Sequence, residues 1–399
     1  MMLKIFKILN ILLKTRKVFF KPKNYQIIIF DDVNDMFENV LKNRRFISLN
    51  VRDYTIDKVY LNHVIILRTF VFFLKNYNKG INLYTSYLIS VIEAINPKLV
   101  LTGIDNSLKF SEIAKFLYKK INFIAVQNAA RYDFDKFSLL YKRKLIKNNF
   151  NKKYFLPHYY CFSEFEKKNC KKNKINVNNF YCYGSLKLSN YIHKLKLNKK
   201  NIKKKYDVAL ISEASIGKDL LWKKKGVDNA FAEVAKYTIK FCKDNNLKFV
   251  FLSKRPKGKS RQLEFDFYKK YLSDDDYNYL IKYAIKEKNK KEDNYKYLNE
   301  SKIAVGVCST MLREKIALGG KIMSCDFTPL KFYNSPFDKR LITKRKNYKV
   351  FENKLKKIFR MKNKKYNLII NNQKLINQNS GIPTFQYLNQ HINRIITND

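Results

Sequence analysis

The residues Ile303–Asp326, IAVGVCSTMLREKIALGGKIMSCD, decide the fold that the sequence predicts. They begin with a short apolar run that is typical of a buried strand, and they continue with a segment that favours a helix. Gly319 and Gly320 are suited to end that helix, and a second apolar run follows them. A strand, a crossover helix and a parallel strand of this length form a βαβ unit, so we expect an α/β domain here.

The turn between the first strand and the helix predicts an anion site. The small hydroxyl residues Ser309 and Thr310 stand at the helix start, where free N–H groups and the positive end of the helix dipole favour a negative charge. Glu314 lies one turn further on the same face, within reach of a hydroxyl group on the molecule that carries the anion. A phosphate beside a sugar hydroxyl indicates a nucleotide. The alternative is that Ser309 only caps the helix and that the dipole alone favours Glu314.

Composition limits the classes of function. A chain of 399 residues with 46% hydrophobic residues is expected to form two domains. A net charge of +49 ordinarily indicates nucleic acid or an anionic membrane as partner. The chain is equally rich in Asn, Ile, Tyr and Phe, whose codons contain much A and T, so genome composition explains much of the charge. No zinc-finger spacing or RNA-binding signature accompanies it, and we do not expect nucleic acid as the main partner.

The cysteine and histidine residues predict neither a metal site nor disulfides. The six cysteines include no C-x-x-C pair, and the four histidines are scattered along the chain. This usage is typical of a reduced, cytoplasmic protein without a bound metal.

Residues 1–22 have the pattern of a basic amphipathic helix, with Ile5, Leu9 and Leu12 on one face and Lys4 and Lys7 on the other. Lysines interrupt the apolar run well before the length that spans a bilayer, and no secretory signal is present. The segment either lies on the anionic inner leaflet, as a peripheral membrane contact, or packs against the body of the protein.

Residues 23–190 predict an N-terminal Rossmann-like domain. Its expected strands end in polar loops that contain Asp31, Asp105 with Asn106, and Gln127 with Asn128 and Arg131. Ligands of open α/β sheets bind at this carboxyl edge. Asp105 is therefore our candidate for a general base, with Asp31 behind it. The alternative is that Asp105 caps the helix that begins near Leu108.

A lysine-rich linker is expected at 191–205, a second Rossmann-like domain at 206–345 and a helical segment at 346–399. In the second domain Lys254 and Arg255 follow an apolar strand, where charge-assisted hydrogen bonds could bind a phosphate. The alternative is an exposed lysine turn. Glu213 follows the first strand of this domain and is a lower-ranked candidate for the base.

Six short motifs in this order resemble the two-domain GT-B glycosyltransferase architecture, and more narrowly the bacterial surface-carbohydrate proteins of capsule and O-antigen (lipopolysaccharide) loci. They are Ile29–Asp31, Leu101–Asn106, Val126–Arg131, Tyr183–Ser185, Lys254–Pro256 and Ser309–Glu314 with the two glycines after it. The resemblance covers most of the chain and implies two Rossmann-like domains that face each other across a cleft.

The resemblance also implies roles for individual residues. A nucleotide-activated sugar would bind mainly to the C-terminal domain, as substrate and with no further cofactor. The donor would contact Lys254, Arg255, Ser309, Thr310, Arg313 and Glu314, and the glycan or lipid-linked acceptor would lie near Asn106, Gln127, Asn128 and Arg131. The implied activity is sugar transfer in which cations replace a divalent metal. Ala129 departs from the glycine of related sequences, and Lys254–Pro256 lacks the histidine that glycerol-phosphate transferases often carry there.

Other functions remain open at this point. A polyol-phosphate transferase or a nucleotide-sugar epimerase would use the same architecture, because fold does not determine chemistry. A non-enzymatic protein that binds nucleic acid or an anionic membrane would show steep salt dependence and indifference to Glu314→Ala.

Overall fold

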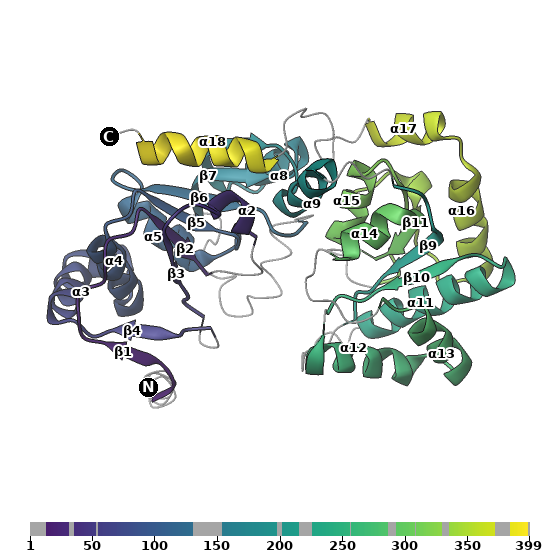
Figure 1. The fold of residues 1–399 in the computed structure, drawn as a ribbon, viewed down its shortest axis with the longest axis horizontal. Helices are drawn as coiled ribbons and strands as arrows, with labels where there is room; N and C mark the ends of the chain where they lie inside the picture. The colour runs from purple at the N-terminus through teal and green to yellow at the C-terminus, as the bar shows by residue number, and fades with distance from the viewer. Residues whose placement is uncertain are drawn as a thin grey trace.

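The computed structural model consists of two α/β domains that lie side by side (Figure 1). It describes residues 13–31, 36–52, 55–130, 154–197, 202–214, 226–255, 257–285, 293–307, 309–328, 335–371 and 384–397. Both central sheets are parallel within these residues, as the sequence predicts.

The N-terminal domain is built on six parallel strands, counted within the described residues, in the order β3-β2-β5-β6-β7-β8. Strands β2 and β5 are buried along their whole length, because helices cover both faces of a parallel sheet. The strands are β2 (Ile27–Phe30), β3 (Phe46–Leu49), β5 (Leu99–Thr102), β6 (Asn122–Val126), β7 (Phe155–Cys161) and β8 (Asn176–Cys182). The helices are α2 (Glu38–Leu41), α3 (His63–Asn76), η1 (Tyr77–Lys79), α4 (Leu83–Ile95), α5 (Leu108–Leu117), α8 (Glu164–Lys172) and α9 (Leu186–Leu197).

The C-terminal domain repeats the architecture with five parallel strands, again within the described residues, in the order β10-β9-β11-β12-β13. The strands are β9 (Tyr206–Ile211), β10 (Phe249–Leu252), β11 (Ser301–Gly306), β12 (Lys321–Cys325) and β13 (Ile342–Thr343). The helices are α11 (Val227–Asp244), α12 (Gly258–Tyr271), α13 (Asp274–Lys282), α14 (Asp293–Glu300), α15 (Thr310–Ala317), η3 (Lys339–Leu341), α16 (Tyr348–Arg360) and α17 (Asn363–Asn371).

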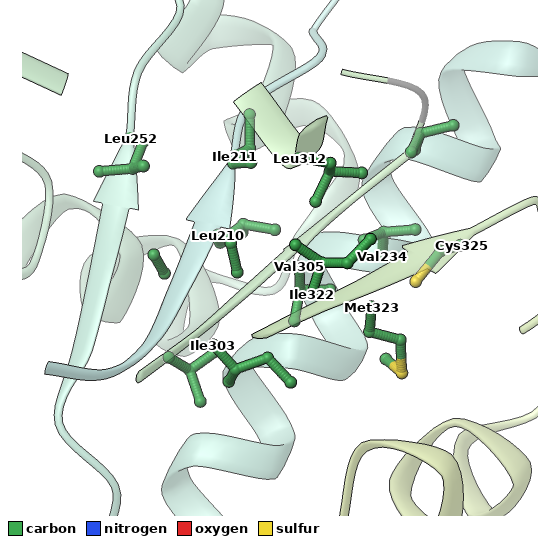
Figure 2. Close-up of a cluster of buried hydrophobic side chains, with 14 of the residues drawn as sticks. Leu210, Ile211, Val234, Leu252, Ile303, Val305, Leu312, Ile322, Met323 and Cys325 are labelled. Carbon is green, nitrogen blue, oxygen red and sulfur yellow. The ribbon is translucent and has the colours of Figure 1, made fainter. Parts of the chain in front are cut away.

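Close packing at β11 positions the start of α15. Figure 2 shows Leu312 of α15 among the apolar side chains of β9, β11 and β12. A Cβ atom on Gly306 would lie 3.4 Å from Cβ of Ile211 and 3.7 Å from Cδ1 of Leu312. These are ordinary van der Waals distances, so the space beside Gly306 is filled by β9 and α15, and buried Leu312 fixes which way the first turn of α15 faces.

The last helix, α18 (Thr384–Thr397), returns to the N-terminal domain. It lies along that domain beside α2, whereas α16 and α17 lie on the other domain (Figure 1). Phe385, Leu388 and Ile392 are buried in a cluster with Ile27 of β2 and Leu99 of β5. The predicted helical segment 346–399 is thus divided between the two domains.

Two predicted segments differ from the structure. Residues 1–12 lie outside the described residues, and the expected helix over 1–22 gives way at Arg16–Val18 to strand β1, which pairs in parallel with β4 (Lys58–Tyr60). An amphipathic pattern cannot anticipate a strand partner 42 residues away. The expected linker 191–205 begins later, because α9 continues to Leu197. Among the described residues, no helix has both the length and the apolarity that crossing a bilayer requires.

Candidate functional site

The first turn of α15 lies at the junction of the two domains. Ser309 is the N-cap, and its hydroxyl accepts a hydrogen bond from the N–H of Met311 at 3.4 Å. Oγ1 of Thr310 accepts a hydrogen bond from the N–H of Ala130 at 2.8 Å. Ala130 belongs to the loop after β6, so the amino end of α15 faces the carboxyl edge of the N-terminal sheet. Both hydroxyl residues remain partly exposed.

Glu314 links the same helix to two further elements. Its Oε1 accepts hydrogen bonds from the hydroxyls of Ser185, at 2.6 Å, and Tyr295, at 2.8 Å. The residue is 2% exposed, and burial raises the pKa of its carboxyl group. Within the described part of the chain Oε2 accepts no hydrogen bond, so it retains the capacity to accept one, although the residue is almost wholly buried.

Arg313 points to a different neighbour. Its guanidinium forms a buried ion pair with Glu166, at the start of α8, and donates to Oγ of Ser163 at 3.3 Å. It also lies over the rings of Phe162 and Phe165. Arg313 was predicted to contact the donor, but it is fully buried and offers no surface to a ligand. Its contacts join the two domains.

Lys254 and Arg255 follow β10, as predicted, and a buried carboxylate holds their loop in place. Glu264 of α12 accepts hydrogen bonds from the N–H groups of Lys254, at 2.7 Å, and Arg255, at 2.9 Å. It also accepts one from the hydroxyl of Ser253 at 2.8 Å. The Lys254 ammonium lies 3.6 Å from the carboxylate of Glu213. The loop backbone is thus fixed while the Lys254 side chain reaches solvent.

One N–H group of the Arg255 side chain has no acceptor within the described residues. Its Nε is buried and has no hydrogen-bond partner among the described residues. A buried guanidinium N–H without an acceptor is costly unless an anion or water completes it. The parallel strands β10, β9 and β11 are neighbours, so this loop and the start of α15 stand at the same carboxyl edge.

On the acceptor side, Gln127 and Asn128 follow β6. The Gln127 side chain donates to the carbonyl of Ala129 at 2.8 Å and accepts from the N–H of Phe162 at 2.8 Å, so it braces the loop rather than facing solvent. Asn128 and Asn106 are partly exposed at the same edge. Arg131 lies outside the described residues.

Both candidate bases are nearly buried. Asp105 is 1% exposed and accepts a hydrogen bond from the Tyr159 hydroxyl at 3.0 Å. It does not cap α5, because Ser107 is the N-cap. Asp31 accepts from the N–H of Val51 at 2.9 Å and pairs with Nε of Arg52 at 3.1 Å. These contacts suit carboxylates that shape the loops after β2 and β5.

Three residues that form hydrogen bonds at this site were not predicted from the sequence. Glu264 and Tyr295 gave no signal, since a helical carboxylate and a helical tyrosine are common. A sequence signal existed for Glu166, because Ser163 and Glu166 form the S-x-x-E pattern of a capping box. In the structure the Ser163 hydroxyl lies 2.8 Å from the Glu166 carboxylate. No group of three potential metal-ligating side chains occurs within the described residues.

Comparisons with known proteins place this geometry in a family. The model of a family described as "putative O-antigen biosynthesis protein" matches residues 124–336, more than half of the 399-residue chain. No curated protein matches the chain.

Solved structures show the same architecture. The chain is similar to UDP-GlcNAc 2-epimerase from Neisseria meningitidis bound to UDP-GlcNAc, with 14% identity, 94% of this chain and 99% of that chain covered, and a TM-score of 0.52. It is also similar to S. aureus MnaA in a co-structure with UDP, with 11% identity and a TM-score of 0.54. This match covers 95% of this chain and 96% of the MnaA chain. A third is UDP-GlcNAc 2-epimerase from Methanocaldococcus jannaschii in complex with UDP-GlcNAc and UDP, with 14% identity, 91% and 99% covered, and a TM-score of 0.50. These likenesses establish the GT-B-like fold, and the family match establishes that the chain belongs to the family of O-antigen biosynthesis proteins.

Proposed function

We propose that the protein is a glycosyltransferase-like enzyme of surface-polysaccharide biosynthesis. It transfers a sugar from a nucleotide-activated donor, bound by the C-terminal domain, to a glycan or lipid-linked acceptor in the cytoplasm. The observation that carries the proposal is the hydrogen bond from Ala130 to Thr310, at 2.8 Å. It turns the anion-binding end of α15 toward the loops of the opposite domain, where an acceptor would lie.

The spacing of the sheet suits a diphosphate. The loop with Lys254 and Arg255 follows β10, and α15 follows β11, with β9 between them. Neighbouring strands are about 4.8 Å apart, so the two loops start roughly 10 Å apart. The phosphates of a nucleoside diphosphate fit between a helix amino end on one side and two cations on the other.

These groups act on the charge that develops during transfer. The oxygen of the acceptor hydroxyl forms a bond to the anomeric carbon and its proton passes to solvent water, while the bond from that carbon to the diphosphate breaks and the electron pair leaves with the diphosphate. Lys254, Arg255 and the helix end stabilise the departing charge more than the bound substrate, which lowers the barrier. In this proposal they supply the positive charge that a divalent metal supplies elsewhere.

Glu314 orients the donor. Oε1 is held by Ser185 and Tyr295, and Oε2 accepts a hydrogen bond from a ribose hydroxyl. Asp105 enters the proposal as a support for its loop, through Tyr159, and the partly exposed Asn106 and Asn128 face the acceptor.

A ligand screen tests the nucleotide site. The melting temperature of the full chain is measured with UDP, CDP, CMP and GDP, because a ligand that binds the native state raises it. At least one nucleotide is expected to do so, and Glu314→Gln to reduce the shift. Tyr295→Phe, which removes a contact to Oε1 and leaves Oε2 in place, is the matched control. No shift with any nucleotide would overturn the proposal.

A second experiment separates transfer from epimerisation. The chain is incubated with a panel of nucleotide sugars, with and without a polysaccharide-derived acceptor, and the products are analysed by mass spectrometry and chromatography. A transferase releases the nucleoside diphosphate when the acceptor is present. An epimerase converts the sugar without an acceptor, and that result would favour the alternative function.

A further inference from the structure

Helix α3 presents an apolar face to solvent. Val64, Leu67, Val71 and Leu74 are three or four residues apart, and Phe70 is three residues from Leu67 and four from Leu74, which places all five on one stripe. These five side chains are between 41% and 73% exposed. A surface helix usually shows the reverse pattern, with its polar face outward, so this stripe requires an explanation.

The opposite face of α3 packs against the rest of the N-terminal domain. Ile65 and Thr69 are buried, and the ring of Phe72 packs against Phe116 of α5, with centroids 5.4 Å apart. The helix lies at the outer margin of the N-terminal domain, on the side away from the C-terminal domain (Figure 1). The exposed stripe therefore takes no part in the hydrophobic core of this domain.

A second apolar element adjoins the start of α3. Asn62 caps the helix by accepting from the N–H of Val64, and its side chain donates to the carbonyl of Phe19 at 3.0 Å. Phe19 is 64% exposed and Phe20 is 83% exposed. The two aromatic rings thus extend the apolar stripe beyond the helix.

Exposed cations occur on the same two segments as these apolar side chains. Arg68 and Lys75 are exposed on α3, and Lys17 and Lys21 are exposed on the adjoining segment. The sequence has no Asp or Glu in residues 13–30 or 58–80. Apolar side chains flanked by Lys and Arg match a membrane surface that contains anionic lipid.

We propose that the α3 stripe, with Phe19 and Phe20, docks the protein on an anionic lipid bilayer. The apolar side chains enter the interface and the cations of the two segments meet the lipid headgroups. A second copy of the chain fits this surface less well, because a two-fold contact would bring two identical sets of positive charges together. A typical protein partner is also disfavoured, since lysine is depleted at such interfaces.

Vesicle sedimentation of the full chain tests the proposal, with phosphatidylcholine vesicles that contain or lack phosphatidylglycerol. The chain is expected to bind the vesicles that contain phosphatidylglycerol, and Leu67→Gln with Leu74→Gln to lower the partition coefficient at least about tenfold. Leu368→Gln is the matched control, because Leu368 is a 62% exposed leucine on α17.

A charge variant gives an independent test. Arg68→Glu with Lys75→Glu is expected to weaken binding to phosphatidylglycerol vesicles, whereas Lys364→Glu with Lys365→Glu, at exposed positions of α17, is not. Melting temperatures and light scattering are recorded for every variant. Wild-type binding by the α3 variants would overturn the proposal, as would failure of the wild-type chain to bind. A dimer that the leucine variants dissociate, without a change in lipid binding, would assign the surface to a second copy instead.

Discussion

Glu166 and Arg313 form a fully buried ion pair that joins the two domains. Glu166 lies in the first turn of α8, which follows β7 of the N-terminal sheet, and Arg313 lies in the first turn of α15, the helix that carries the candidate anion site. Gln127 contacts Glu166 as well, at 3.4 Å. The contact therefore ties the proposed acceptor-side loop and the proposed donor-side helix to one shared point, so it fixes how one faces the other.

Arg313→Met is expected to lower the free energy of unfolding by about 3–5 kcal/mol, because it leaves the Glu166 carboxylate buried without its partner. Adding Glu166→Gln removes that charge and should restore much of the loss. Urea unfolding measures both variants. Glu164→Gln, which breaks the exposed pair with Lys167, is the control and should cost less than about 1 kcal/mol. Equal effects of Arg313→Met and Glu164→Gln would contradict this account.

Arg255→Met is expected to weaken nucleoside diphosphate binding about 10- to 100-fold, the worth of a charge-assisted hydrogen bond. The melting temperature without ligand should barely change, since Glu264 holds the loop through backbone N–H groups that the substitution retains. Titration calorimetry with the nucleotide that stabilises the wild type measures the affinity. Lys269→Met, at an exposed position of α12, should bind as the wild type does. Unchanged affinity of Arg255→Met would remove this residue from the site.

The sequence correctly predicted the helices and strands whose formation depends on neighbouring residues. Ile303–Asp326 predicted a strand, a helix and a second strand, and β11, α15 and β12 fill that segment. Ser309 was considered as the cap of that helix, and it is the N-cap of α15. Each of these features depends on residues within a few positions of one another, where capping and periodicity are decisive.

Contacts between residues that are far apart in the chain could not be predicted from sequence patterns. Arg313 and Glu166 are separated by 147 positions in the chain, and neither residue type indicates a domain junction. The pairing of β1 with β4 and the return of α18 to the N-terminal domain depend in the same way on partners that a periodic pattern cannot name. The buried ion pair of Arg313 was not predicted for this reason, because a helical arginine near a candidate anion site resembles a ligand until its partner is known.

Glu314→Gln should change how stability depends on pH. Burial raises the folded-state pKa of Glu314 above 4.5, so the folded chain holds this proton more tightly than the unfolded chain does. The stabilisation from this group is complete below the unfolded pKa and is lost as the pH rises through the folded pKa. Glutamine does not titrate. The free energy of unfolding of the wild type relative to Glu314→Gln should therefore fall as the pH rises from about 4 to about 8, measured by urea unfolding. A difference that stays constant or grows would contradict the assigned burial.

Leu388→Ala tests whether α18 belongs to the N-terminal core. Leu388 is 0% exposed and lies in the cluster that contains Ile27 and Leu99 of the central strands. Truncation leaves a cavity against the sheet, so we expect a loss of about 2–5 kcal/mol in the free energy of unfolding. Leu368→Ala removes the same atoms from a 62% exposed position on α17 and should change stability by no more than about 0.5 kcal/mol. If both variants unfold at the wild-type urea concentration, α18 is a loosely attached tail, and the N-terminal domain must be stable without it.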